Sequence, residues 1–145
     1  MTKKDRRDSG FTLIELMIVL FILGLLAALV APRLMGRVGK AKVKTAATQM
    51  QLLGTALDLF YLDIGRYPTE EEGLQALYQR PSNLAQWSGP YLNKAVPKDP
   101  WGNDYIYKFP GEHGPYDLIS LGADGSQGGE GDNQDITNWQ AEETR

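Results

Sequence analysis

The sequence predicts an α+β protein in which a long N-terminal helix packs on a small antiparallel β-sheet. Its 145 residues begin with an apolar run followed by an amphipathic stretch, both typical of helices. Two short segments with the alternation of β-strands come much later, and a loop rich in glycine and carboxylates follows them. The part after the apolar run is large enough for one small globular domain.

The segment Phe11–Ala31 predicts a helix that spans a membrane. It holds 21 residues and a single charged side chain, Glu15. A helix of this length measures roughly 30 Å, the thickness of a bilayer's hydrocarbon core. Residues 1–10 are charged and poor in apolar side chains, so we interpret them as a leader or a cytoplasmic stub. A cleavable secretory signal is the weaker interpretation, because its apolar core spans about 7–15 residues.

Glu15 needs an explanation, because an ionised carboxylate is unfavourable inside a membrane. No Lys, Arg or His lies one helical turn from it within the apolar run. If the chain is cleaved before Phe11, the new amino group lies one turn from Glu15, and it could pair within the chain or with an axially shifted neighbour. Alternatively, the carboxylate lies in the headgroup zone. The residues alone leave these alternatives open.

A stripe of apolar residues indicates that an amphipathic helix follows, over residues 34–64. Its members recur every three or four positions and share one helix face: Ala46, Met50, Leu53, Leu57, Phe60 and Ile64. We interpret this face as the seam against the chain's own domain, with a partner-binding face as the minor alternative. The apolar run and the stripe together predict one helix of about 50 residues, weakened at Pro32, Gly36, Gly39 and Gly54.

The remaining elements are short. Gly65 and the residues after it end the long helix, and Thr69–Glu72 has the pattern of a capping box. A short helix is expected to reach about Gln79, and residues 82–103 to form an ordered loop. Strands are expected over residues 104–109 and 116–121, joined by a turn into a hairpin. Apolar side chains are expected to attach the short helix and the loop to the core: Leu74, Leu77, Tyr78, Trp87, Tyr91, Leu92, Val96 and Trp101.

Composition argues against several classes of function. The chain has no cysteine, so it has neither disulfides nor a thiol nucleophile. Residues 109–144 carry eight carboxylates and no Lys or Arg, so nucleic acid is not an expected partner. The single histidine, His113, lies in a predicted turn, where solvated histidines are typical, and no acid–base pair or nucleophile accompanies it. We therefore expect no enzymatic activity.

The segment Ser120–Trp139 combines carboxylates with five glycines. Glycine lets a backbone turn its carbonyls inward, and carboxylates and carbonyls are the oxygen ligands that Ca²⁺ prefers. The spacing from Asp124 to Asp135 equals that of an EF-hand loop, but Gly128 occupies a ligand position, the twelfth residue is Asp in place of a bidentate Glu, and the flanks read as a strand and a turn, so we reject an EF-hand. A Ca²⁺ site and a solvated acidic loop both stay open at this point.

Several motifs resemble a known family. The segment Gly10-Phe11-Thr12-Leu13-Ile14-Glu15 resembles the processing site of type IV pilins and pseudopilins. Three distal segments are similar to the major pseudopilins of the type II secretion system: residues 65–69 (GRYPT), residues 96–102 (VPKDPWG) and residues 120–139, from SLGADG through DI to NW. The resemblance covers nearly the whole chain.

The resemblance implies a pilin-like fold with a leader at residues 1–10, a transmembrane and assembly helix at 11–31 and a periplasmic globular domain at 32–145. A prepilin peptidase would cleave between Gly10 and Phe11 and methylate the new amine, and Glu15 would pair with the Phe11 amine of a neighbouring subunit. The chain would be anchored in the inner membrane by a single span. Copies would then form the periplasmic pseudopilus filament that drives export of folded proteins, together with minor pseudopilins and inner-membrane secretion components.

The resemblance also implies that the C-terminal loop binds Ca²⁺. Carried onto this sequence, the ligands would be the side chains of Asp124 and Asp135 and the carbonyls of Leu121 and Ser126, with Asp132 or Asn133 completing the shell. The alternative function is a monomeric, membrane-anchored module that binds a periplasmic ligand. It predicts an uncleaved N-terminus and no self-association.

Overall fold

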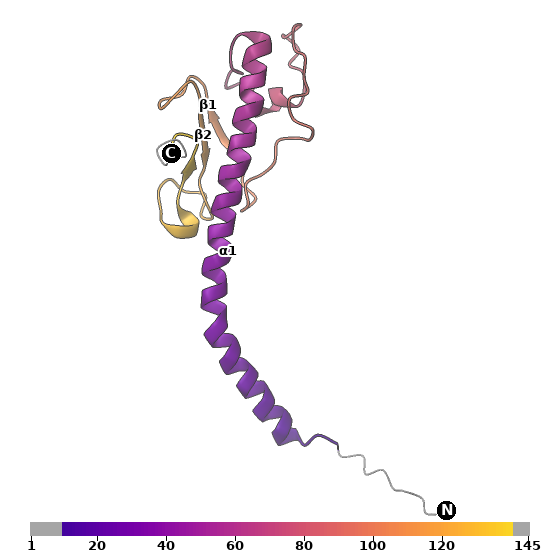
Figure 1. Cartoon of the computed structure of the whole chain (residues 1–145), viewed down its shortest axis with the longest axis vertical. Helices are drawn as coiled ribbons and strands as arrows, with labels where there is room; N and C mark the ends of the chain where they lie inside the picture. Colours follow the sequence, from indigo (N-terminus) through magenta and orange to yellow (C-terminus); the bar gives the residue numbers. More distant parts are fainter. Residues whose placement is uncertain (1–9, 141–145) are drawn as a thin grey trace, which may run out of the picture. The chain divides into compact units, whose positions relative to one another are not determined.

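The computed structural model describes residues 10–140, apart from the side chains of residues 32–35. Its elements are one α-helix, two 3-10 helices (η) and three strands (Figure 1), in the order α1 (Leu13–Ile64), η1 (Leu74–Leu77), β1 (Ile106–Lys108), β2 (Asp117–Ser120), η2 (Gly131–Asn133) and β3 (Ile136–Thr137). They confirm the predicted α+β fold with a long N-terminal helix. The chain divides into two compact units between Arg37 and Val38, and each is described by itself below.

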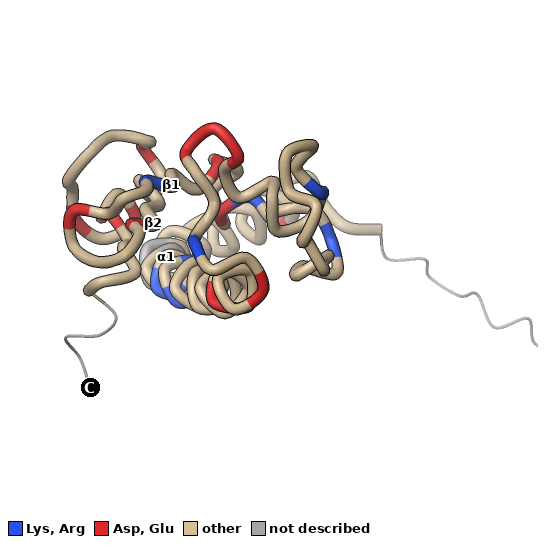
Figure 2. The backbone as a smooth tube through the Cα atoms, turned by 90° about the horizontal axis from the view of Figure 1, so that it is seen from above, with Lys and Arg blue, Asp and Glu red and all other residues tan. Residues whose placement is uncertain are grey.

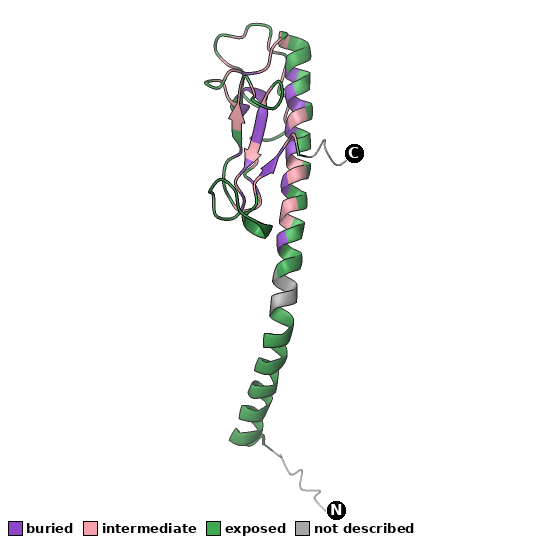
Figure 3. Cartoon of the chain, turned by 90° about the vertical axis from the view of Figure 1, so that its left-hand side faces the viewer, coloured by how far each residue is buried: buried purple, intermediate pink, exposed green. Residues whose placement is uncertain are grey.

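In the first unit, the side chains from Gly10 to Ala31 are all exposed (Figure 3). α1 is long and apolar enough to cross a membrane. Its 52 residues agree with the single helix of about 50 residues predicted from the sequence. Of the predicted leader, only Gly10 lies within the described residues.

In the second unit, the predicted stripe of α1 forms the core. Ala46, Met50, Leu53, Leu57 and Phe60 are at most 3% exposed, and Ile64 packs against them. The core also includes Ala56, which was not predicted. Figure 3 shows buried and half-buried residues on the side of α1 that faces the sheet. The prediction that this face packs on the chain's own domain is therefore confirmed.

The end of α1 follows the predicted signals. Gly65 adopts the left-handed conformation, with φ of 84°, and its N–H donates to the carbonyl of Tyr61 at 2.7 Å. In the predicted capping box, the Thr69 N–H donates to Glu72 Oε2 at 2.9 Å and the Glu72 N–H donates to Thr69 Oγ1 at 3.2 Å.

The short helix predicted to reach Gln79 is wrong in extent. Gly73, with φ of 55°, interrupts it, and only the 3-10 helix η1 (Leu74–Leu77) forms. Leu74 and Leu77 are buried as predicted, but Tyr78 is 37% exposed and Ala76 is buried in its place. The tighter winding of a 3-10 helix repeats every three residues, so it presents a different face than the α-helical spacing had predicted.

The antiparallel hairpin is confirmed, although both strands are shorter than predicted. β1 pairs with β2, with Tyr107 opposite Leu118, and β2 pairs with β3 in the order β1-β2-β3. β3 was not predicted. The long loop attaches to the core as predicted, through partly buried Trp87, Tyr91, Leu92, Val96 and Trp101. For example, Trp87 Nε1 donates to the carbonyl of Ala76 at 2.7 Å.

A salt bridge reinforces the capping box, and it makes stability depend on pH. Arg66 donates to both carboxylate oxygens of Glu72, at 2.7 and 2.8 Å, and lowers the pKa of Glu72 from its ordinary 4.5 to about 2. Because the folded pKa lies below the unfolded one, this stabilisation is complete above about pH 4.5 and is lost as the pH falls towards 2.

We expect Glu72→Gln to lower the free energy of unfolding by about 2 kcal/mol at pH 7, a value reduced because Arg66 is partly exposed. Urea unfolding at pH 7, 4.5 and 2.5 should show the gap between wild type and variant closing as the pH falls. Exposed Glu71→Gln is the matched control and should leave the curve unchanged. A gap that stays constant across this range would refute the role of the salt bridge.

Candidate functional site

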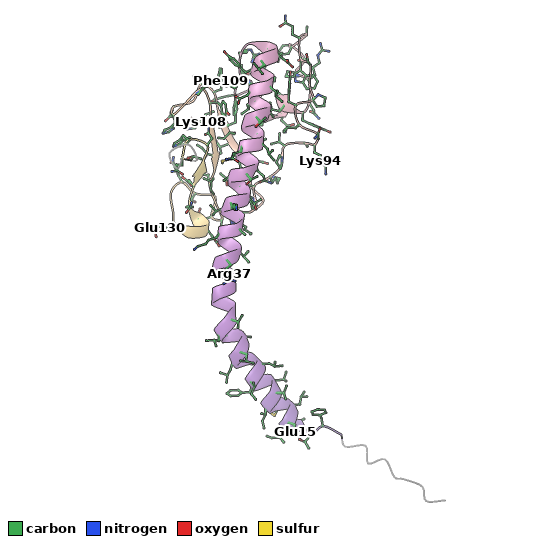
Figure 4. The ribbon with its side chains drawn as sticks, in the orientation of Figure 1. Glu15, Arg37, Lys94, Lys108, Phe109 and Glu130 are labelled. Atoms are coloured by element: carbon green, nitrogen blue, oxygen red, sulfur yellow. The ribbon has the colours of Figure 1, made fainter. Side chains whose placement is uncertain are left out.

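The first candidate region is the start of α1, where Glu15 lies in the first turn (Figure 4). Glu15 Oε2 accepts hydrogen bonds from the N–H and the hydroxyl of Thr12, both at 2.9 Å, and the Glu15 N–H donates to Thr12 Oγ1 at 3.3 Å. Thr12 and Glu15 therefore form a second capping box, which the sequence analysis did not identify. Both bonds to the carboxylate fall on one oxygen, so Oε1 keeps its capacity to accept another donor.

Phe11 and Gly10 precede this capping box. Both are exposed, and Phe11 is exposed over 86% of its surface. The bond between them is therefore accessible to a peptidase, and cleavage would leave the new amino group directly before the capped first turn. The positive end of the helix dipole also favours a carboxylate at this position.

The second candidate region is the acidic loop, residues 121–135, between β2 and β3. Its two ends meet at a narrow neck, where the Ala123 N–H donates to the carbonyl of Asp132 at 2.8 Å. Gly122 makes this approach possible: it has φ of 66°, and a Cβ there would lie 2.8 Å from the carbonyl oxygens of Asp132 and Gln134.

The loop organises two of the predicted ligands. Asp124 Oδ1 accepts the N–H of Ser126 at 3.0 Å, and Asp135 Oδ2 accepts the N–H of Gly128 at 2.8 Å. The other oxygen, Asp135 Oδ1, is buried and has no hydrogen-bond partner. Figure 2 marks acidic residues in red, and they are spread over several loops. Within residues 10–140, no three acidic or histidine side chains are grouped closely enough to hold a metal ion.

Asp132 contacts a different part of the chain. Its side chain packs against Gly39 of α1, so closely that a Cβ at Gly39 would overlap Asp132 Oδ1. The sequence analysis had interpreted Gly39 only as a weak position of the helix. In the structure, the missing side chain lets the acidic loop approach the helix backbone.

The donor set still fits a calcium ion. A buried carboxylate oxygen without a hydrogen-bond partner is costly, and a bound cation would satisfy Asp135 Oδ1. The remaining ligands would come from Asp124 and from backbone carbonyls, which are hard oxygen donors of the kind that Ca²⁺ prefers. The Ca²⁺ site stays a prediction, and so does its ligand set.

His113 was predicted to be a solvated histidine in a turn, but its ring contacts two other residues. Its ring stacks on Trp139, with ring centres 3.9 Å apart, and its Nδ1 lies 3.0 Å from Asp117 Oδ2. Burial raises the pKa of Asp117, but hydrogen bonds from His113 and from the N–H groups of Glu112 and His113 outweigh this, so the pKa is lowered. The stack on Trp139 ties the hairpin turn to the C-terminal segment, and the contact with Asp117 ties the turn to β2.

Comparison with known proteins gives consistent matches. The family "Type II secretion system (T2SS), protein G" matches residues 33–139, and the "Prokaryotic N-terminal methylation motif" matches residues 5–31. Relatives named "Type II secretion system core protein G" come from Vibrio cholerae, 49% identical over 94% of this chain and 95% of the relative, and from Pseudomonas aeruginosa, 48% identical over 92% and 96%. The crystal structure of the major pseudopilin from enterohaemorrhagic Escherichia coli is similar with a TM-score of 0.62 and 37% identity, over 75% of this chain and 96% of that one.

Proposed function

The chain belongs to the type II secretion system protein G family and is a structural subunit of the pseudopilus, and from this premise we propose how its first helix and its acidic loop act. A prepilin peptidase cleaves between Gly10 and Phe11 and methylates the new amine. The chain is held in the inner membrane by the single span Phe11–Ala31, and its globular domain is periplasmic. The methylation-motif match and the accessible bond after Gly10 support this step.

Exposure of the apolar span is the observation that carries the assembly proposal. The apolar side chains from Phe11 to Ala31 are exposed in the monomer, so they need either lipid or other copies of the same helix. In the filament, copies replace lipid around the span. The Glu15 carboxylate then accepts the positively charged Phe11 amine of a neighbouring subunit, which sets the axial stagger. Minor pseudopilins and inner-membrane secretion components are the further partners.

The acidic loop has a stabilising role in this proposal. Bound Ca²⁺ supplies positive charge that neutralises the carboxylates of Asp124 and Asp135. The chain holds these carboxylates in place through the N–H groups of Ser126 and Gly128, and the neck at Gly122 closes the loop. The carbonyls of Leu121 and Ser126 would be the backbone ligands. Asp132 would need to turn away from Gly39 to join them, so Asn133 is the better candidate to complete the shell.

The N-terminus of the protein isolated from membranes tests the processing proposal. We expect mass spectrometry to find N-methylphenylalanine at Phe11, since the peptidase removes residues 1–10 before assembly. A Gly10→Leu variant is the control: a bulky side chain at the cleavage position should leave the leader in place. A wild-type chain that still begins at Met1, or one that begins near Pro32, would contradict the proposal and favour the monomeric anchored module.

A further inference from the structure

The turn Asp99–Asn103 lies against the end of β2, although residues 104–120 separate it in sequence from the acidic loop. Asp99 is only 4% exposed, and its carboxylate has three donors. Oδ1 accepts the N–H of Trp101 at 3.0 Å and the N–H of Asn103 at 2.8 Å, and Oδ2 accepts the hydroxyl of Ser120 at 2.7 Å. The buried carboxylate therefore ties the turn to the last residue of β2.

Asn103 extends this connection into the acidic loop. Its side-chain Nδ2 donates to the carbonyl of Gly122 at 3.2 Å. Its backbone is held on both sides by Asp99, because the Asn103 N–H donates to the carboxylate and the Asn103 carbonyl accepts the Asp99 N–H at 2.8 Å. The amide of Asn103 is therefore presented to the loop from a rigid turn.

The peptide between Gly122 and Ala123 is fixed at both of its polar groups. Its carbonyl accepts Asn103 Nδ2, and its N–H donates to the carbonyl of Asp132. This peptide lies directly between Leu121 and Asp124, the first two proposed ligands. A backbone carbonyl has no rotamer of its own, so its direction depends on the dihedral angles of the neighbouring peptides. Gly122 permits many such angles, and the hydrogen bond from Asn103 selects one of them.

We propose that Asn103 and Asp99 are positioning residues for the calcium site: they orient the carbonyl of Leu121 and the side chain of Asp124 without touching the ion. This inference rests on the proposed Ca²⁺ site of the acidic loop. Residues that hold metal ligands in place commonly change metal affinity by about 10- to 100-fold when they are removed. Asn103 contributes through Gly122, and Asp99 contributes by holding Asn103 and Ser120.

Calcium titration of the full chain in detergent micelles, followed by isothermal calorimetry, tests this inference. We expect Asn103→Ala to raise the Kd for Ca²⁺ about tenfold, because the ligands must be ordered on binding. Asn83→Ala is the matched control: Asn83 Nδ2 also donates one hydrogen bond, to Glu72 Oε1 at 3.2 Å, but in another part of the domain. The Kd of Asn83→Ala should equal that of the wild type, and this result would distinguish a positioning role of Asn103 from a general loss of stability.

Ser120→Ala is a second, milder variant. It removes the hydroxyl bond to Asp99 and leaves Asn103 intact, so we expect a smaller rise in Kd in the same direction. Unchanged Kd values in both variants, with Ca²⁺ binding in the wild type, would overturn the positioning role alone. A wild-type chain that does not bind Ca²⁺ would overturn the proposed site itself, and this inference with it.

Discussion

Glu15→Gln is expected to abolish filament assembly while the globular domain stays folded. Glutamine keeps an oxygen that can accept the N–H and hydroxyl of Thr12, so the helix cap survives. It removes the negative charge, and the Phe11 amine of a neighbouring subunit is then buried among apolar helices without a counter-charge. Breaking a buried ion pair by removing one partner costs about 3–5 kcal/mol, and in a filament this cost recurs at every subunit.

Electron microscopy of assembled filaments and thermal unfolding of the same preparations provide the two measurements. We expect no filaments from Glu15→Gln and an unchanged melting temperature, because Glu15 is exposed and lies outside the core of the second unit. Thr12→Ala is the complementary control, since it removes the capping box and keeps the charge. It should still form filaments. Filaments of normal length from Glu15→Gln would rule out charge pairing as the basis of assembly.

The long-range architecture was predictable where one physical signal dominated. The spacing from Ala46 to Ile64 predicted the buried face of α1, because a helix repeats every 3.6 residues and this stretch is long enough to average out exceptions. The capping box at Thr69 and Glu72 was predictable because its pattern is local. β3 was missed because a two-residue strand has no alternation to detect. Its pairing with β2 depends on how the acidic loop folds back, which no local pattern predicts.

The candidate site was predictable in residue type but not in arrangement. Oxygen-rich composition indicated the acidic loop, and the motif at residues 10–15 indicated the processing site. The contact between Asp132 and Gly39 joins residues far apart in the sequence, so no local pattern contains it. The same holds for Asn103 and Gly122. The predicted loop over residues 82–103 contains Asn103, but its sequence does not indicate the segment against which the end of the loop packs.

Asp135→Asn is expected to be at least as stable as the wild type without calcium and less stable than the wild type when calcium is added. Without Ca²⁺ the variant should be at least as stable as the wild type, because Asn keeps an oxygen for the N–H of Gly128 and removes a buried negative charge, which costs more to desolvate than a neutral amide. With Ca²⁺ at a hundred times Kd, the wild type should gain about 2.7 kcal/mol, since the ion binds only the folded state. The variant lacks this charged ligand and should gain much less.

Thermal unfolding of the full chain in detergent, once in a chelator and once in excess Ca²⁺, measures the stability of each variant without and with the ion. A gain of this size corresponds to a rise of roughly 10–20 °C in the melting temperature of a domain this small. Asp63→Asn is the matched control, because Asp63 accepts the Tyr91 hydroxyl at 2.9 Å at the C-terminal end of α1 and should keep the full calcium-dependent rise. A simple charge effect would change all Asp→Asn variants alike. Only a cation held by Asp135 makes the two variants diverge on calcium addition, so equal rises in both would remove the site.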